Sequence, residues 1–243
     1  MAISDLTDRQ QRLLQAVIKE YIKEAEPVGS KTLVQRYDLD VSPATVRNEM
    51  VRLIDEGLLQ KPHASAGRQP TTTGYRFYIN ELLEEEELPV IEEVSIKQRL
   101  WPERFKKYSL FREAAKALAD SANQLALILI NDTLYSAGAV NILDHPEFFD
   151  IDVTRTVLHL LDRPELVSEI FEKAVADQGI NALIGTELDL ESLRHCGVVF
   201  SRFQAGGEQG TVGLLGPNRM AYGKIFPRIR YMSGLLEELG RNW

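Results

Sequence analysis

The sequence predicts a multidomain α+β protein, in which an amino-terminal winged helix-turn-helix domain precedes an α+β domain with an antiparallel sheet. Three observations predict this fold. Three helix patterns with recognisable ends fill the first 57 residues. An extended segment, a turn and a second extended segment follow them directly. After residue 109, strand-like apolar runs and amphipathic helices occur in mixed order. We place the two domains at residues 1–79 and 109–243, and interpret residues 80–108 as an acidic helical linker.

The composition of the 243 residues is typical of a soluble globular protein, with 44% hydrophobic and 26% charged residues. No apolar run reaches the ~20 residues that a membrane-spanning helix needs, and the first residues lack the basic and apolar order of a secretory signal. Cys196 is the one cysteine, which fits a reducing compartment. We therefore expect a cytoplasmic protein without a membrane partner.

The net charge of −8 is distributed unevenly along the chain. Residues 1–78 hold 11 Lys and Arg against 10 Asp and Glu, a balance of +1. Residues 79–243 hold 17 against 26, a balance of −9, and the two parts add up to −8. The acidity belongs to the carboxyl-terminal part, so the amino-terminal part is free to bind a polyanion locally.

The third helix pattern, SPATVRNEMVRLIDEG over residues 42–57, organises the amino-terminal domain. Ser42 is suited to cap the helix, Pro43 to its first position, and Gly57 to the positive φ that follows a helix end. At about 100° per residue, one face collects apolar residues: Val46, Met50, Leu53 and Ile54. The other face and its flanks collect small and polar residues: Ala44, Thr45, Arg47, Asn48, Glu49, Val51 and Arg52. Amide and guanidinium groups read base edges in the major groove of DNA.

Two further helix patterns precede this one. Thr7 and Gln10 have the spacing of a capping box, so the first helix is expected to start there and to end before Pro27. Ser30 is expected to cap a short second helix. Asp38 lies in the turn that follows, where Asp tolerates the left-handed conformation.

The segment after the third helix has the pattern of a two-stranded wing. Residues 58–63 read as extended, ASAG turns the chain, and residues 68–72 lead it back. The tip region carries His63, Ser65, Gly67 and Arg68. Small residues let a backbone approach phosphates closely, and an arginine on a narrow loop suits a minor groove. Each pattern alone fits a solvated helix face, a plain three-helix bundle or an ordinary turn, but their order predicts a DNA-binding winged helix.

These patterns assign the contacts with DNA. Ser42 starts the recognition helix and bonds a phosphate. Thr45, Asn48 and Arg52 face base edges, and Arg47 reaches bases or backbone. The four tip residues hold the wing on the sugar-phosphate backbone or in the minor groove. Because one such domain covers too little surface for tight specific binding, we expect a homodimer that reads two half-sites of double-stranded DNA.

The rest of the chain predicts a linker and an α+β domain. The helix after Tyr78 is expected to run to Pro89, and the glutamates at 84–87 either mark the exit from the DNA-binding domain by repelling phosphate or form a solvated helix end. Asp162 is expected to cap a helix, and Gly206-Gly207 to form a hairpin-like turn. The expected helices cover residues 109–124, 164–176 and 225–239, and the expected strands cover 125–130, 133–143, 181–188, 196–203 and 210–217.

No catalytic or metal-binding pattern emerges from the sequence. None of the histidines at 63, 145, 159 and 195 has a partner at metal-ligand spacing, and Cys196 opens an apolar strand, which favours a core position. GLLGPNR over residues 213–219 lacks the lysine and hydroxyl of a phosphate-binding loop. We expect no enzyme, no cofactor and no metal.

Several segments resemble the heat-inducible transcription repressor family, HrcA. In the amino-terminal part these are EPVGSKTL, DVSPATVRNEM, GLLQKPHASAGRQPT and GYRFYIN. In the carboxyl-terminal part they are LYSAGAVNIL, HPEF and GTVGLLGPNRMAYGKIFPRIRYMSGLL. The resemblance implies a dimeric repressor that binds an inverted repeat, the CIRCE operator, upstream of chaperone operons. It also implies a GAF-like carboxyl-terminal domain and a GroEL-type chaperonin that keeps the repressor active.

The chain departs from the resemblance in one place. Members of the family usually carry an inserted region between the stretches like LALILI and LYSAGAV, whereas here Asn131, Asp132 and Thr133 alone separate them. The inserted region is associated with dimer contacts in the family. We therefore expect a smaller sheet, or one completed by a second chain.

Two other hypotheses stay open at this point. The GAF-like domain of a winged-helix regulator could sense a small-molecule ligand instead of chaperonin supply. Alternatively, the winged helix could dock a protein and not DNA.

Overall fold

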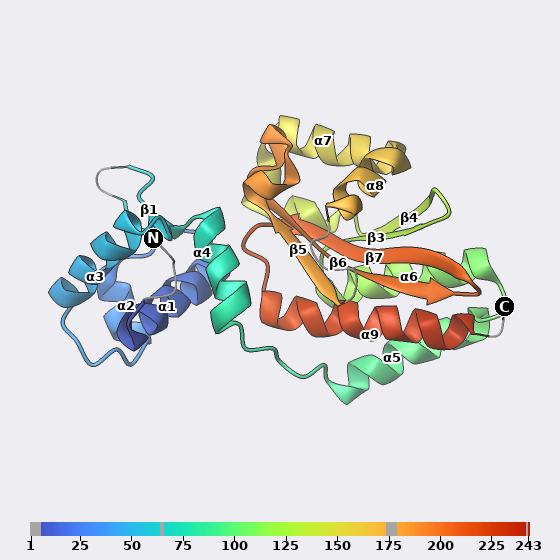
Figure 1. Cartoon of the computed structure of the whole chain (residues 1–243), viewed down its shortest axis with the longest axis horizontal. Coiled ribbons are helices and arrows are strands. Elements are labelled where there is room, and N and C mark those ends of the chain that lie inside the picture. Colours follow the sequence, from blue (N-terminus) through green and yellow to red (C-terminus); the bar gives the residue numbers. More distant parts are fainter. Residues whose placement is uncertain (1–5, 64–65, 174–178, 242) are drawn as a thin grey trace. The chain divides into compact units, whose positions relative to one another are not determined.

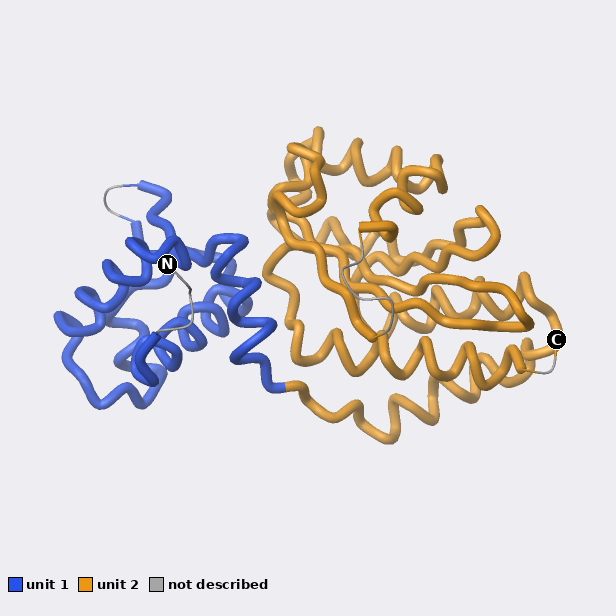
Figure 2. Tube along the Cα trace, in the orientation of Figure 1, with its two compact units in different colours: residues 1–84 blue, residues 85–243 orange. Residues whose placement is uncertain are grey.

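A computed structural model describes residues 6–63, 66–173, 179–241 and 243. The chain divides into two compact units, residues 1–84 and 85–243 (Figures 1 and 2). Unit 1 is mainly helical, whereas unit 2 combines helices with an antiparallel sheet, so the predicted α+β class with an antiparallel sheet is confirmed.

Three helices form the first part of unit 1: α1 (Asp8–Glu24), α2 (Ser30–Arg36) and α3 (Pro43–Asp55). The predicted capping box is confirmed, because Thr7 accepts from the Gln10 backbone N–H and the Gln10 side chain bonds the Thr7 N–H. Ser42 caps α3, and Gly57 adopts a positive φ of 72° after its end. The core of the unit includes Leu14, Val17, Ile18, Leu33, Val46, Met50, Leu53 and Tyr75.

Two short strands and a last helix complete unit 1. Strand β1 (Leu59–Gln60) pairs antiparallel with β2 (Gln69–Pro70), in the register Leu59↔Pro70. Helix α4 (Thr72–Phe77) continues into a π-helical turn (Tyr78–Leu82). The two strands lie within the segments predicted to be extended, 58–63 and 68–72, but each is only two residues long, and Pro62 and His63 form a bend.

Three local predictions in unit 1 were wrong. Gly29, not Ser30, is the N-cap of α2, and Ser30 is a buried first helical residue. The left-handed residue in the turn is Asp40, with φ of 50°, and not Asp38. The helix after Tyr78 ends at Leu82 instead of reaching Pro89.

The run of glutamates explains that early helix end. Glu84 lies 3.3 Å from Lys19 in unit 1, whereas Glu85 forms an ion pair with Arg230 in unit 2. In unit 2 the Glu86 N–H also donates to the Gly223 carbonyl oxygen at 2.9 Å. In a helix, glutamates three and four residues apart would lie close together and repel each other, whereas an extended backbone keeps them apart. It also lets Glu84 and Glu85 each reach a cation of its own unit.

Unit 2 is organised around a five-stranded antiparallel sheet with the order β4-β3-β7-β6-β5 (Figure 1). Its strands are β3 (Leu125–Ile130), β4 (Thr133–Ala137), β5 (Ile180–Ile184), β6 (Cys196–Ala205) and β7 (Glu208–Pro217). Two tight turns set the register. Asn131 and Asp132 both have positive φ between β3 and β4, and Gly206 and Gly207 do so between β6 and β7.

Helices cover both faces of this sheet. Helices α6 (Lys107–Ala122) and α9 (Tyr222–Gly240) pack on one face, with α5 (Val90–Leu100) against α6. Helices α7 (Ile151–Asp162) and α8 (Pro164–Glu172) lie on the other face (Figure 1). The core on that face joins residues such as Leu125, Leu127, Val157, Val167, Phe171, Val198 and Phe200. The two helices predicted over 109–124 and 225–239 are confirmed as α6 and α9, and each buries an apolar face.

Helix α7 corrects the sequence prediction for this region. Asp162 is the last residue of α7 and does not cap α8, whose N-cap is Arg163 without a side-chain bond. The expected strand over 133–143 ends at Ala137, because Gly138 takes a φ of 79° and the chain enters a 3-10 turn (Asn141–Asp144). Strand β5 likewise ends at Ile184, before a 3-10 turn (Gly185–Leu188).

Candidate nucleic-acid interface

Helix α3 presents small and polar side chains on its outer side. Its inner residues Val46, Met50 and Leu53 are at most 2% exposed, which fixes the rotation of the helix. The exposed residues of α3 are Pro43, Ala44, Arg47, Asn48, Val51, Arg52 and Asp55, with Thr45 partly buried. One amide, of Asn48, and two guanidiniums, of Arg47 and Arg52, are therefore exposed to solvent on one helix.

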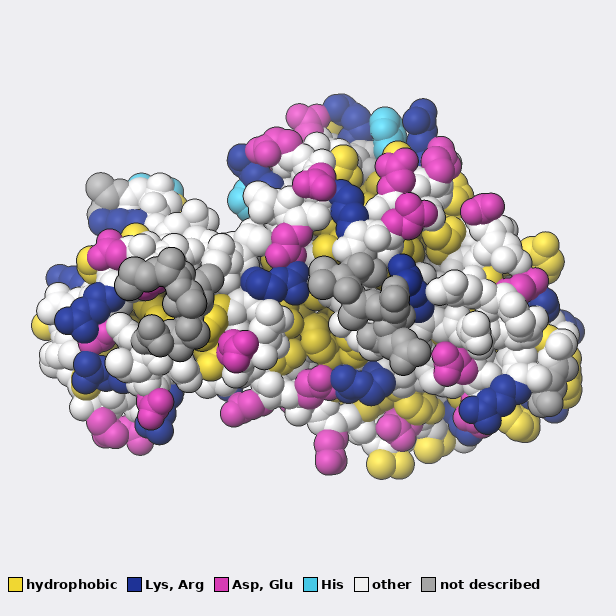
Figure 3. All heavy atoms as spheres, in the orientation of Figure 1, with side chains coloured by type: hydrophobic (Ala, Val, Ile, Leu, Met, Phe, Trp, Pro, Cys, Tyr) yellow, Lys and Arg dark blue, Asp and Glu magenta, His cyan; other side chains and the backbone are white. Residues whose placement is uncertain are grey.

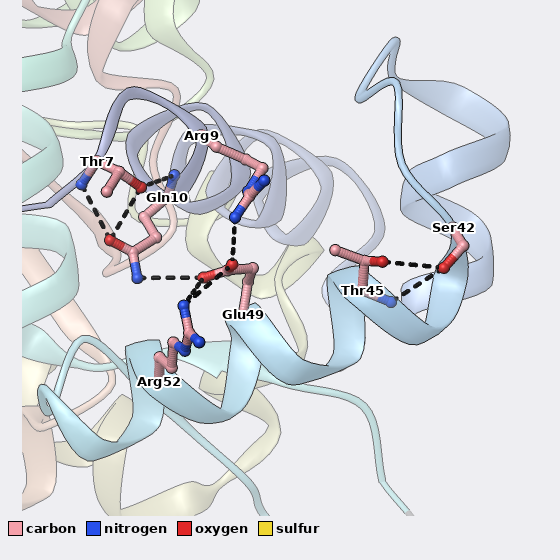
Figure 4. A network of polar contacts seen from close by, with 7 residues as sticks. All are labelled: Thr7, Arg9, Gln10, Ser42, Thr45, Glu49 and Arg52. Atoms are coloured by element: carbon pink, nitrogen blue, oxygen red, sulfur yellow. Dashed lines mark hydrogen bonds and ion pairs between the residues drawn. The ribbon is translucent and has the colours of Figure 1, made fainter.

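The first turn of α3 holds the polar pair Ser42 and Thr45. Ser42 Oγ accepts from the Thr45 backbone N–H at 3.2 Å and lies 3.0 Å from Thr45 Oγ1 (Figure 4). The Ser42 hydroxyl thus satisfies the helix end, as the sequence predicts. A bond from Ser42 to a phosphate stays a prediction.

Glu49 forms a polar network that the sequence did not predict. It is buried at 5% exposed, although the pattern placed it on a solvent-facing flank of α3. Glu49 Oε1 accepts from Arg9 Nη2 of α1 at 2.7 Å and from Arg52 Nη1 at 3.3 Å, and Oε2 accepts from Gln10 Nε2 at 3.1 Å (Figure 4). Arg52, which the sequence assigns to base edges, is therefore held by a carboxylate on its own helix.

The returning segment of the wing pattern packs on the loop before α2. Val28 and Arg68 form an antiparallel bridge, with Val28 N–H donating to Arg68 O at 2.8 Å and Arg68 N–H donating to Val28 O at 2.9 Å. A Cβ on Gly67 would lie 2.6 Å from the Val28 carbonyl carbon. Gly67 therefore has a structural reason for its missing side chain, in addition to the predicted closeness to phosphate.

A hollow of about 360 Å³ lies between α3 and this segment. Its cationic lining residues are Arg47, Lys61 and Arg68, and none of the described residues that line it is acidic. Arg68 Nη1 donates to Ala66 O at 3.2 Å, while its buried Nε has no acceptor in the described part of the chain. Three cations at one hollow attract an anion.

The structure thus separates the predicted contacts into two groups. Gly67 and Arg68 lie with Arg47 at the hollow, whereas Arg52 lies with Arg9 and Gln10 around Glu49. His63 is exposed, and Ser65 lies outside the described residues. Three further residues belong to these groups but were not predicted from the sequence: Lys61 at the hollow, and Glu49 and Arg9 on the other side. Lys61 could have been found from the sequence, since it is a cation within the extended segment of the wing pattern. The contact between Arg9 and Glu49 could not, because it depends on how α1 packs against α3.

Unit 2 contains Cys196 and three of the four histidines, at positions 145, 159 and 195. Cys196 is fully buried, and burial raises the pKa of its thiol to about 12, so it stays protonated at neutral pH. Burial, and next the charge of Arg219, lower the pKa of His145, whose Nε2 lies 3.2 Å from Gln124 Nε2. Across the described ranges, no three His, Cys, Asp or Glu side chains gather so that they could hold a metal ion. The same residues include no helix with the length and apolarity to cross a membrane.

The fold and this interface define an α+β protein whose small helical unit offers a polar helix face between basic flanks, an arrangement typical of DNA-binding regulators. The chain belongs to the HrcA family: the family model described as "HrcA protein C terminal domain" matches residues 44–226. Family membership indicates a transcription regulator rather than an enzyme.

Relatives and a solved structure agree with this membership. The chain is 26% identical to the "Heat-inducible transcription repressor HrcA" of Carboxydothermus hydrogenoformans, with 96% of the chain and 98% of the relative covered. It is 28% identical to the protein of the same name from Acetivibrio thermocellus, with 96% of each covered. A crystal structure titled as that of a hypothetical protein matches with a TM-score of 0.78 at 19% identity, over 98% of this chain and 99% of that one, and supports the fold alone.

The first of these alignments also shows that the chain is shorter than its relative. It extends over 337 positions, which is 94 more than the 243 residues of the chain, so at least 94 positions have no counterpart here. This difference agrees with the predicted absence of an inserted region.

Proposed function

We propose that the chain is a heat-inducible transcription repressor that binds double-stranded DNA through unit 1, folded as a winged helix-turn-helix. The observation that carries the proposal is α3, whose exposed side offers Asn48 and two guanidiniums next to a hollow lined by three cations. The names of the relatives support repression and heat induction.

The proposed contacts follow the geometry of α3 and the segment after it. Thr45, Asn48 and Arg52 read base edges, and each good bidentate contact gives roughly 1–3 kcal/mol of discrimination. Ser42 bonds a phosphate at the helix start, and Arg47 reaches bases or backbone. The wing residues His63, Ser65, Gly67 and Arg68 lie on the sugar-phosphate backbone or in the minor groove.

We propose that two copies bind an inverted repeat of the CIRCE type and that unit 2, as a GAF-like domain, joins them. Several apolar side chains of unit 2 are exposed, and four of them lie on α5 and the turn after it: Val90 at 73%, Ile91 at 82%, Val94 at 47% and Trp101 at 48%. Hydrophobic atoms are visible along this edge in Figure 3, where Figure 1 places α5. An inverted repeat needs two copies related by a twofold axis, so we assign this surface to a second copy.

The dimer assignment has a direct test. Ile91→Asp should raise the dissociation constant of the dimer at least about tenfold, since a charge would have to be desolvated at the contact. Val140→Asp is the matched control, because Val140 is 71% exposed on another segment of unit 2. Sedimentation across a dilution series measures both variants, and an equal dimer constant for Ile91→Asp and the unchanged protein would contradict the assignment.

We propose that a GroEL-type chaperonin keeps unit 2 folded and so couples repression to heat. A short turn, Asn131-Asp132, takes the place of a longer connection between β3 and β4. Because the sheet is therefore small, we expect unit 2 to be marginally stable, to unfold on heating and so to release DNA. A melting transition far above the growth temperature in the absence of chaperonin would contradict this regulation.

Regulation by a small molecule is the second candidate function. A hollow of about 590 Å³ in unit 2 is lined by polar residues, including Gln204, Gln209 and Glu237. A saturable ligand that changes the affinity for DNA would favour this alternative over regulation by chaperonin.

The main experiment is a gel-shift titration of the full chain on an inverted-repeat chaperone-operon duplex and on a scrambled duplex of the same length. The proposal expects selective binding by a dimer, with the oligomeric state measured by light scattering on the same samples. Equal affinity for both duplexes would contradict it.

A further inference from the structure

We infer that Arg9, in the first turn of α1, is a further DNA contact that binds a backbone phosphate on the flank of α3 opposite the hollow. This inference rests on the proposed function, since it deepens the description of the same DNA-binding surface. Glu49 and Arg47 are two residues apart on α3 and therefore point about 200° apart around its axis. Arg9 meets Glu49, whereas Arg47 lines the hollow.

The geometry leaves the Arg9 guanidinium open to solvent while its carboxylate partner is covered. The Arg9 side chain is 53% exposed, whereas the Glu49 side chain is 6% exposed. One nitrogen of Arg9, Nη2, donates to Glu49 Oε1 at 2.7 Å. A guanidinium has five N–H donors, and the other N–H groups of Arg9 have no acceptor among the residues that the structure describes.

The charge balance of this cluster favours an anion. Two guanidiniums, from Arg9 and Arg52, share one carboxylate, so the cluster carries a surplus of one positive charge. Both oxygens of Glu49 already accept, Oε1 from the two arginines and Oε2 from Gln10. Arg12, three residues further along the same side of α1, is also exposed and adds positive charge. A phosphate oxygen is the acceptor that matches these donors in charge and geometry.

The same helix carries a second network of ion pairs, whose charges balance. Glu20 is 3% exposed and accepts from Arg36, which also donates to Glu24 at 2.6 Å. There one guanidinium serves two carboxylates, and Lys23 lies 3.7 Å from Glu24, so the network carries no surplus of positive charge. Arg36 is 46% exposed on its side chain, close to the 53% of Arg9. Because Glu20 lies 11 residues after Arg9, the two networks are about 16 Å apart along α1. Arg36 is therefore the matched control for Arg9.

The test is the salt dependence of DNA binding by the full chain. Arg9→Gln keeps a donor for Glu49 and removes the charge. It should weaken binding to the inverted repeat and to the scrambled duplex by the same factor, roughly threefold to tenfold near 0.15 M salt. The slope of log affinity against log salt should fall by about 0.9, the value for one phosphate contact. Arg9→Lys should restore the slope, and Arg36→Gln should leave both quantities unchanged.

The outcomes separate this inference from the proposed function. A slope for Arg9→Gln equal to that of the unchanged protein, with selective binding intact, would overturn the Arg9 contact and leave the proposed function standing. Equal losses for Arg9→Gln and Arg36→Gln would also overturn it, because they would report a general loss of structure in unit 1. Absence of selectivity in the unchanged protein would instead contradict the proposed function. Urea unfolding of both variants verifies that they fold alike.

Discussion

The two flanks of α3 hold their cations in different ways. On one flank Arg47, Lys61 and Arg68 line a hollow without an acidic residue, and no ion pair joins them to a carboxylate in the described part of the chain. On the other flank Arg9 and Arg52 share the buried Glu49. Unpaired cations attract a phosphate from any direction. Guanidiniums held by a carboxylate have already lost side-chain freedom in the unbound protein, so they present their donors in a fixed direction. On the proposed function, we expect cations on both flanks to add affinity, and the guanidiniums at Glu49 also to meet DNA in a fixed orientation.

The largest expected effect belongs to the exposed face of α3 beside Glu49. The double variant Asn48→Ala, Arg52→Ala should lose about 1–3 kcal/mol of discrimination per contact, and so most of the preference for the inverted repeat. Arg47→Ala, on the hollow flank, should weaken binding to both duplexes, with a smaller change in the preference for the inverted repeat. The ratio of the two dissociation constants measures this difference. An unchanged ratio in the double variant would break the assignment of orientation to the Glu49 flank.

The next largest effect is expected on the stability of unit 1, from a change at Gly67, which lines the hollow. Gly67→Ala should lower the free energy of unfolding of unit 1 by about 1–3 kcal/mol, because the new methyl would collide with the Pro27 and Val28 backbone. Gly29→Ala is the matched control, since its Cβ would meet Thr32 Oγ1 at a comfortable 3.8 Å and its φ is −92°. Urea denaturation compares the two variants. Equal stabilities would show that the segment before β2 tolerates a side chain there.

The smallest expected effect belongs to a single cation of the hollow. Lys61→Ala should reduce affinity for the inverted repeat and the scrambled duplex alike, by a factor of roughly three at moderate salt, and lower the salt slope by about 0.9. Titrations at several salt concentrations measure the slope. If Lys61→Ala changed the preference between the duplexes instead, the hollow would contribute to sequence reading and the comparison would need revision.

The sequence predicts those parts of the fold that local signals specify. The ends of α3 follow from Ser42, Pro43 and Gly57, and β3 coincides with the apolar run at 125–130. The turn at Gly206-Gly207 is confirmed for the same reason, because two positive φ values need glycine. Helix α7 was missed although Val153, Val157 and Leu160 recur at helical spacing and are buried, so a signal was present.

Contacts between distant segments could not be predicted. Glu49 is buried because α1 packs across it and supplies Arg9 and Gln10, which lie about 40 residues earlier in the chain. The bridge from Val28 to Arg68 joins two loops across a similar separation. Periodicity gives the rotation of a helix but not the element that covers each flank. The individual DNA contacts stay predictions.

One measurement tests most directly whether the exposed side of α3 and its hollow flank face DNA. Single cysteines introduced by Asn48→Cys, Lys61→Cys or Arg36→Cys are labelled with a photoreactive group and irradiated on the inverted-repeat duplex. The native Cys196 is fully buried with its pKa raised to about 12, so labelling is confined to the introduced thiol. We expect crosslinks to DNA from positions 48 and 61 and only a background signal from position 36. Crosslinks from position 36 without any from position 48 would contradict this expectation.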